Sequence, residues 1–381
     1  MKYKLEEIVE VTMGQSPKSK YYNNEGNGYP FLQGNRTFGF RYPTFDTYTT
    51  MMTKPAKSGD VIMSVRAPVG DLNVAPIDMC LGRGVCSLRM KNGNQDFLFY
   101  MMKYYVPTLL EKESGTVFGS VNRKDINGLE VNIPEDKKIQ QKIACYLKML
   151  DDAIENNEKI NKNLEEQAQA IYKQMFIDTT NNQRSTCQAS EYFDITIGKT
   201  PPRKQQQWFT TNPSDVTWLS ISDMGNCGTY INKSSENLTQ AAIDKFNVKI
   251  VPNNTVILSF KLTVGRIAIT YGTMTTNEAI AHFKTDKPFI NEYLYCYLNN
   301  FNYETMGSTS SIASAINSKI IRAMPFIVPT DDELSLFHSV AGSMFRQMLN
   351  NQLENDSLIE MRDTLLPKLM SGEIDVSNLD I

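Results

Sequence analysis

The chain has 381 residues, of which 41% are hydrophobic and 21% charged, and its formal net charge at pH 7 is −3. This composition is typical of a folded protein with room for two domains and argues against disorder. No apolar run approaches the roughly 18 residues of a membrane-spanning helix, and the charged start MKYKLEEIVE lacks the apolar core of a signal peptide. We therefore expect a cytoplasmic protein.

An internal repeat organises the chain. The stretch VTMGQSPKSK at residues 11–20 returns as ITIGKTPPRK at 195–204. DVIMSVRAPVG at 60–70 likewise returns as TVILSFKLTVG, and GSVNRKDINGLEVNIP at 119–134 as SAINSKIIRAMPFIVP. Both later matches have an offset of 195, which pairs Ser64 with Ser259, Gly70 with Gly265, Asn122 with Asn317 and Pro134 with Pro329. The repeat predicts two similar domains, each followed by a long helix.

The first domain, here called the first head, spans residues 1–134. The alternating apolar pattern of DVIMSV predicts a strand, and the spacing of DFLFYMMKYY at 96–105 predicts a helix whose aromatic residues belong to the core. A small sheet with short helices, an α+β fold, is therefore expected. Its candidate DNA-binding residues are basic side chains of the polar loops: Lys18, Lys20, Arg36, Arg41, Arg66 and Arg83.

Residues 135–178 form a predicted spacer helix. Steps of four and three residues from Ile143 give an unbroken coiled-coil seam with two polar layers at its middle. The apolar members are Ile143, Leu147, Leu150, Ile154, Leu164 and Ile171, and the polar ones are Asn157 and Asn161. Asparagine in such a seam lowers stability but fixes the register of the partner helix.

The second head spans residues 179–329. NTVILSFK at 254–261 predicts a strand, and NEYLYCYLNN at 291–300 predicts a core helix. Basic residues recur at places that correspond to those of the first head, which favours a shared role in binding DNA phosphate groups. They are Lys199, Arg203, Lys204, Lys261 and Arg266.

A second spacer helix is predicted for residues 330–373, and a short tail for 374–381. Thr330 and Glu333 form a capping box at its start, and the seam of the first helix recurs 194 residues later, with Asn351, Asn355, Leu358, Leu365 and Leu369 among its members. Two residues do not fit. Arg362 falls in the seam, and Pro367 is expected to kink or end the last turns.

The matched asparagines suggest that the two helices pair with each other, although two amphipathic helices packed on separate cores would also have apolar stripes. Antiparallel pairing joins residues whose numbers sum to 512, such as Asn161 with Asn351 and Asn157 with Asn355. Parallel pairing satisfies the asparagines equally well. The residues alone therefore leave the direction open.

Charge is unevenly distributed along the chain. Lys and Arg outnumber Asp and Glu by 16 to 13 in the first head and by 13 to 10 in the second. Acidic residues are in excess by 9 to 7 in residues 135–178 and by 10 to 3 in residues 330–381. A local basic face, rather than the whole-chain charge, governs binding to nucleic acid. The loops LQGNRTFGFRYP and RKQQQWFTTN also carry side chains that can read base edges.

Signatures of catalysis are weak in this sequence. IGKT at 197–200 imitates a phosphate-binding loop, but Phe193 stands where that motif requires glycine. The sequence contains no NPPY or DPPY string of an amino-methyltransferase. The six scattered cysteines and two histidines provide no zinc-ligand spacing, and His338 is expected to pack rather than react. We therefore expect no catalytic residues and no metal site.

These stretches, together with IQQKIACYLKMLDDAIENNEKINKNLEEQAQAIYKQMF, TVGRIAIT and LLPKLMSGEI, resemble the DNA specificity subunit of a Type I restriction-modification system. The resemblance implies two target-recognition domains joined by an antiparallel coiled coil in a pseudo-twofold arrangement. It also implies that each head reads half of an interrupted, asymmetric DNA site. The helices would dock two methyltransferase subunits, which restriction and motor subunits join. S-adenosylmethionine, ATP and Mg²⁺ are expected in those partner subunits and not in this chain.

Two hypotheses follow from the sequence. The first is a non-catalytic subunit that recognises double-stranded DNA and recruits methyltransferases. The second is a duplicated scaffold that binds only proteins. Replacing the basic residues of the head loops distinguishes them, because only the first predicts a salt-sensitive loss of DNA binding.

Overall fold

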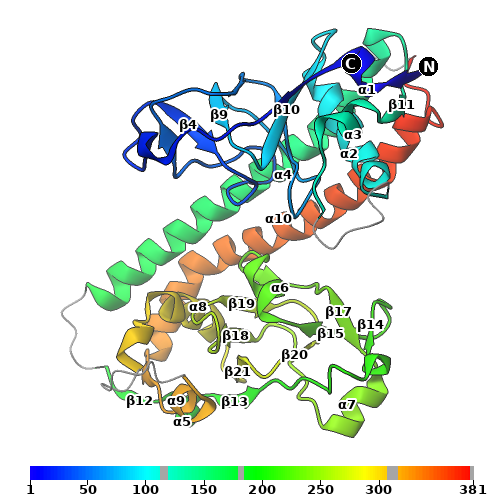
Figure 1. Ribbon diagram of the computed structural model, residues 1–381. Coiled ribbons are helices and arrows are strands. Elements are labelled where there is room, and N and C mark those ends of the chain that lie inside the picture. The colour runs from blue at the N-terminus through cyan, green and yellow to red at the C-terminus, as the bar shows by residue number, and fades with distance from the viewer. Residues whose placement is uncertain (112–118, 179–183, 307–315, 378–381) are drawn as a thin grey trace. The chain divides into compact units, whose positions relative to one another are not determined.

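The computed structural model describes residues 1–111, 119–178, 184–306 and 316–377 (Figure 1). The first two residues of the repeat SAINSKIIRAMPFIVP, the first five of the predicted second head and the last four of the predicted tail lie outside them. The chain divides into two compact units. Unit 1 contains Met1–Glu155 and Asn355–Ile381, and unit 2 contains Asn156–Glu354. Each unit thus comprises one head and a portion of each long helix, α4 (Lys137–Tyr172) and α10 (Asp331–Ser371). None of the described helices is long and apolar enough to span a membrane.

The first head is built on an antiparallel sheet with the strand order β2-β10-β7-β8. Its strands are β2 (Val9–Met13), β10 (Val85–Met90), β7 (Val61–Ser64) and β8 (Leu72–Val74). The short helices α1 (Leu5–Ile8) and α3 (Arg123–Asn127) lie near a strand pair formed by β1 (Lys2–Lys4) and β11 (Glu130–Asn132). Helix α2 (Gln95–Glu111) contributes Phe97, Leu98 and Met101 to a core shared with the portions of α4 and α10 in unit 1.

A second, smaller sheet of the first head has the strand order β3-β5-β4-β9-β6. It follows the single turn η1 (Ser19–Tyr21) and contains β3 (Tyr22–Asn23), β5 (Tyr48–Thr49), β4 (Tyr29–Leu32), β9 (Met79–Leu81) and β6 (Pro55–Ala56). Strands β4 and β9 run parallel, with Phe31 opposite Cys80 and Leu32 opposite Leu81. Their adjacent carboxyl ends bring the turn after β9 beside the loop after β4.

The second head repeats this plan. Its main sheet has the order β13-β21-β18-β19-β16 and consists of β13 (Asp194–Ile197), β21 (Ile280–Lys284), β18 (Val256–Ser259), β19 (Ile267–Thr270) and β16 (Tyr230–Ile231). The smaller sheet follows η3 (Gln206–Trp208) and consists of β14 (Phe209–Thr210), β17 (Glu236–Leu238), β15 (Val216–Leu219) and β20 (Thr275–Thr276).

The helices and outer strands of the second head also have counterparts in the first. They are α5 (Ala189–Tyr192), α8 (Ile290–Asn300), α9 (Ser318–Arg322), β12 (Thr186–Gln188) and β22 (Pro325–Ile327). Helices α6 (Ile221–Gly225) and α7 (Gln240–Phe246) and the turn η4 (Tyr303–Met306) complete the head. The predicted strands and core helices are confirmed, since β7, β18, α2 and α8 cover them.

Hydrogen bonds show that the sequence repeat is a structural repeat. Ser64 Oγ donates to the carbonyl of Pro68 (2.8 Å) and accepts from the amide of Asp71 (2.9 Å). Ser259 Oγ forms the equivalent bonds 195 residues later, to Thr263 (2.6 Å) and from Arg266 (3.0 Å). Gly70 and Gly265 have φ of 95° and 91°, a backbone region that favours glycine. The asparagines of the third match, Asn122 and Asn317, both cap helices.

Within unit 1 the two long helices run antiparallel. The early turns of α4 place Ile143 and Leu147 in the core with Leu369 and Met370 of α10. Farther along α4, Asp151 contacts Arg362 and the carbonyl of Ile154 accepts a hydrogen bond from Asn355 (3.4 Å). Residue numbers of the contacting residues fall along α10 as they rise along α4, so the helices are antiparallel. The sequence alone had left this direction open.

Unit 2 contains an antiparallel pair as well. Asn351 Nδ2 donates to Asn161 Oδ1 (2.8 Å), the pair that the sum of 512 predicts, and Asn161 Nδ2 donates to the carbonyl of Met348 (3.1 Å). Farther along, Tyr172 and Phe176 pack against Phe337. Phe176 belongs to η2 (Lys173–Ile177), a π-helical turn that continues α4.

The buried stripe departs from the predicted seam in places. Asp151 is buried and Leu150 only half-buried, and the same shift of one position places Tyr172 and Phe176 inside. A strict 3.5-residue repeat drifts by about 20° per heptad on a straight helix, and the heads pack beside the seam. Apolar core residues can therefore lie one position away from it.

The two exceptions in α10 also have physical explanations. Arg362 is buried in the seam because Asp151 supplies a buried carboxylate 2.9 Å from its Nη1. The helix does not end at Pro367 but continues to Ser371. The proline removes only the backbone hydrogen bond that its own N–H would donate, and Leu366, Leu369 and Met370 hold the last turns in the core of unit 1.

Candidate nucleic-acid interface

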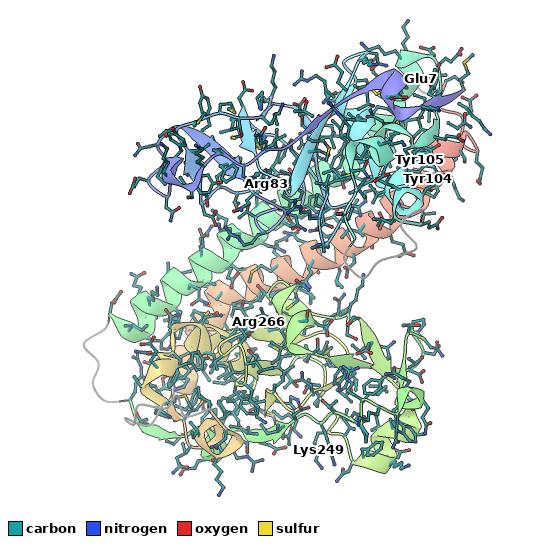
Figure 2. All side chains as sticks on the ribbon, viewed as in Figure 1. Glu7, Arg83, Tyr104, Tyr105, Lys249 and Arg266 are labelled. Atoms are coloured by element: carbon teal, nitrogen blue, oxygen red, sulfur yellow. The ribbon has the colours of Figure 1, made fainter. Side chains whose placement is uncertain are left out.

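A tight turn between β9 and β10 holds Arg83 at the surface of the first head (Figure 2). The amides of Gly82 and Gly84 donate to the carbonyls of Leu32 (2.7 Å) and Gln33 (3.0 Å) at the end of β4. A Cβ atom on Gly84 would lie 2.4 Å from the carbonyl oxygen of Gln33, and one on Gly82 would lie 2.7 Å from its Cα. Glycine at both positions therefore lets the turn pack directly against the loop after β4.

This turn borders a surface cavity of about 360 Å³. Its lining combines two arginines with amide and hydroxyl side chains, namely Ser16, Gln33, Gly34, Asn35, Arg66, Ala67, Arg83 and Gly84. Arg66 and Arg83 are exposed, and neither has a salt-bridge partner among the described residues. Positive charge beside groups that can donate and accept hydrogen bonds is the chemistry that a DNA groove requires.

A second cavity of about 270 Å³ adjoins the first, since Gln33 and Gly34 line both. Its other lining residues are Phe31, Leu32, Arg36, Thr37, Asp46 and Thr47. Arg36 lies 2.6 Å from Asp46, and its hydrogen bond lowers the pKa of that carboxyl. The side chain of Arg36 is nevertheless 75% exposed, so this pair costs little to separate when a phosphate group competes for the arginine.

The remaining basic candidates of the first head lie in different surroundings. Lys18 and Lys20 are exposed at the start of the smaller sheet, and the ammonium of Lys20 lies 4.9 Å from the centre of the Tyr21 ring. Both can reach a polyanion without breaking a salt bridge among the described residues.

Arg41 was expected to face DNA, but its side chain is buried against α4. It is only 6% exposed, and its guanidinium lies 2.6 Å from Asp152, 3.3 Å from Glu155 and 4.0 Å from Asp151. These carboxylates occupy one turn of α4, and they neutralise a charge that could not otherwise be buried. Arg41 thus fastens the loop after β4 to the helix, and we remove it from the candidate interface.

Three basic candidates of the second head are also engaged internally. The ammonium of Lys199 donates to the carbonyl of Phe246 (2.6 Å), and Arg266 donates to that of Ile221 (2.5 Å) beside α6 (Figure 2). Arg203 binds Glu236 (2.7 Å) and lies over the rings of Phe209 and Trp218, at 4.2 and 4.4 Å from their centres. These contacts give each of the three side chains a partner within the head, although only Arg203 has an oppositely charged one.

Lys204 and Lys261 are the exposed basic candidates of the second head that remain. Lys261 and its neighbour Leu262 form the tip of the loop that corresponds to Arg66 and Ala67. Leu262 has a φ of 61° and is 97% exposed, an unusual conformation and environment for leucine. The tip is therefore held outward by the loop framework rather than by burial of its side chains.

The histidines have structural environments. His282 is fully buried, with its ring nitrogens 2.9 Å from the hydroxyl of Thr196 and 2.7 Å from that of Thr276. Burial lowers its pKa to about 3. His338 lies 3.0 Å from Glu292 and stacks on Phe289, as expected of a packed residue. The described residues contain no group of histidine, cysteine and acidic side chains that could hold a metal ion.

Comparison with known proteins identifies the fold and its role. The model of the family described as Type I restriction modification DNA specificity domain matches residues 1–166 and 186–356. The chain belongs to this family. It is a specificity subunit of a Type I restriction-modification system, the non-catalytic component that recognises DNA sequence.

Relatives of this specificity subunit extend over nearly its whole length. The HindI specificity subunit of Haemophilus influenzae is 25% identical over 410 residues, which cover 84% of this chain and 88% of that protein. The MjaIX specificity subunit of Methanocaldococcus jannaschii is also 25% identical, over 99% of this chain and 94% of the relative. The crystal structure of the S subunit from M. genitalium has the same fold, with a TM-score of 0.58, 16% identity and coverage of 97% and 95%.

The sequence indicated Gln33 and Asn35 as part of the base-reading loop LQGNRTFGFRYP, but not that they and Ser16 line one cavity with Arg66 and Arg83. Ser16, Gln33 and Asn35 come from two separate loops, and parallel pairing of β4 with β9 brings them together. The string Gly82-Arg83-Gly84 was the available signal, because an exposed arginine between two glycines suggests a tight functional turn.

Proposed function

We propose that the two heads of this subunit read the two halves of an interrupted, asymmetric DNA site. The observation that carries the proposal is that both heads share one backbone framework and differ in the side chains it presents. A shared framework gives both heads the same approach to the duplex. Different side chains at equivalent places give each head its own preference for bases.

In the first head the proposed DNA surface is the pair of adjoining cavities with Arg36, Arg66 and Arg83, flanked by Lys18 and Lys20. In the second head it is the loop tip with Lys261, together with Lys204. We assign Lys199, Arg203 and Arg266 to the support of this surface, because their side chains are held by hydrogen bonds to Phe246, Glu236 and Ile221.

We also propose that α4 and α10 dock two methyltransferase subunits, with restriction and motor subunits joining the complex. Exposed large apolar side chains support this proposal in each unit. Met149 and Met361 are 60% and 51% exposed in unit 1, and Ile160 and Leu336 are 38% and 59% exposed in unit 2. These side chains lie outside the cores and are available for contact with a protein partner. In this assembly the partners bind S-adenosylmethionine, ATP and Mg²⁺.

Single-molecule sequencing of adenine methylation tests the proposal. DNA is compared from cells that carry this chain with its methyltransferase and from cells that lack only this chain. A new split and asymmetric motif is the expected result. Absence of any difference, with the methyltransferase verified as present and active, would refute sequence reading by the heads and favour a scaffold that binds only proteins.

A further inference from the structure

Arg83 and Glu278 occupy the same place in the two heads. In the first head the amide of Gly82 donates to Leu32 (2.7 Å), and the carbonyl of Gly84 accepts from the amide of Val65 (2.8 Å). In the second head the amide of Asn277 donates to Leu219 (2.9 Å), and the carbonyl of Ala279 accepts from Phe260 (2.9 Å). The turn residues that form these bonds, Gly82 and Gly84 in the first head and Asn277 and Ala279 in the second, are 195 positions apart. The residue between them is an arginine in one head and a glutamate in the other.

A hydroxyl group lies beside each of the two residues, although it binds the backbone in one head and the side chain in the other. The hydroxyl of Ser16 accepts a hydrogen bond from the backbone amide of Arg83 (3.2 Å). Thr200, which the opening repeat matches to Ser16, donates from its hydroxyl to the carboxylate of Glu278. Arg83 and Glu278 are both exposed, so each carries its charge into solvent at the same point of the shared framework.

The two side chains have opposite hydrogen-bonding capacity. The guanidinium of Arg83 only donates, in a fixed fork that matches the O6 and N7 acceptors of guanine. The carboxylate of Glu278 only accepts, and DNA phosphate groups repel it. At a DNA surface, a carboxylate can instead accept a hydrogen bond from a base, such as from the N4 amino group of cytosine. A role in phosphate binding therefore does not explain Glu278.

We infer that these equivalent turn positions determine specificity, with Arg83 reading guanine in one half-site and Glu278 reading the amino group of cytosine in the other. This inference rests on the proposed function, because it assumes that the heads enter a DNA groove. Beyond the proposed function, the inference names one base-selecting residue in each head and the chemical group of the base that this residue recognises.

Methylation motifs of variants test the inference in the complete complex. The motif of the wild-type complex is expected to specify guanine at one position of the first half-site and cytosine at one position of the second half-site. Arg83→Gln should relax or change a single base pair in the first half-site, because glutamine reads adenine rather than guanine. Glu278→Gln should alter the other half-site only. In each variant the unchanged half-site serves as an internal control for folding and assembly.

Two exposed residues away from the turns provide matched controls, Lys57→Gln in the first head and Asp286→Asn in the second. Both controls should retain the wild-type motif. If Arg83→Gln and Glu278→Gln also retain it, the inference is overturned while the proposed function stands. If wild type itself yields no split motif, the proposed function fails.

A variant that methylates no site is examined by competition binding of its assembled complex to duplexes that differ at one base pair. Wild type should discriminate at that base pair by roughly tenfold to a hundredfold. Loss of this discrimination in the variant supports the inference. Discrimination equal to that of wild type overturns it.

Discussion

The buried carboxylate of Asp151 is expected to be essential for the stability of unit 1. It is 1% exposed, lies 2.9 Å from Arg362 and accepts a hydrogen bond from the hydroxyl of Tyr100 (2.7 Å). Asp151→Ala leaves a buried arginine without its buried partner, a change that costs about 3–5 kcal/mol, and leaves a buried hydroxyl unsatisfied, which costs about 1–3 kcal/mol more. Because Arg362 also binds the exposed Asp363, we expect a total of about 4 kcal/mol.

Urea unfolding followed by circular dichroism measures the loss, and hydrogen exchange of α2 locates it. Both tryptophans, Trp208 and Trp218, belong to unit 2, so tryptophan fluorescence follows that unit separately. Asp363→Ala is the matched control, because it removes the exposed partner of the same arginine and should cost less than about 1 kcal/mol. Replacing both Asp151 and Arg362 by leucine should recover part of the stability. Equal losses for Asp151→Ala and Asp363→Ala would refute this reasoning.

Three further predictions concern acid stability, salt dependence and the glycine turn. Because the pKa of His282 falls from 6.5 to about 3 on folding, its contribution is complete above pH 6.5 and declines by about 1.4 kcal/mol per unit as the pH falls towards 3. His282→Gln should therefore reduce the loss of unfolding free energy between pH 7 and 5 by about 2 kcal/mol, and parallel pH profiles would contradict this. Lys204→Ala should lower the magnitude of the slope of log affinity for DNA against log salt concentration by about 0.9, because one phosphate contact is lost. Arg203→Ala should mainly reduce stability. Identical slopes for Lys204→Ala and wild type would exclude a phosphate contact by Lys204. Gly84→Ala should weaken DNA binding by the complex without unfolding it, because its Cβ would displace the turn from Gln33; wild-type affinity in a filter-binding assay would contradict the tight packing.

The sequence by itself determined the domain plan and much of the local structure. Strand alternation, helical spacing and the repeat predicted β7, β18, α2, α8 and both long helices, because these features depend on which residues recur along one element. The repeat, which pairs Ser64 with Ser259, predicted two similar domains, and the two serines form the same short-range hydrogen bonds in both.

Only the tertiary structure decided which charges are available and which cavities they line. Arg41 and Arg83 look alike in sequence, yet one is buried against the carboxylates of α4 and the other is exposed on a turn. Likewise, the partner that permits Arg362 to lie in the seam is Asp151, on a helix about 200 residues earlier in the chain. Burial and ion pairing depend on contacts between residues far apart in sequence, and periodicity within a single element carries no information about such contacts.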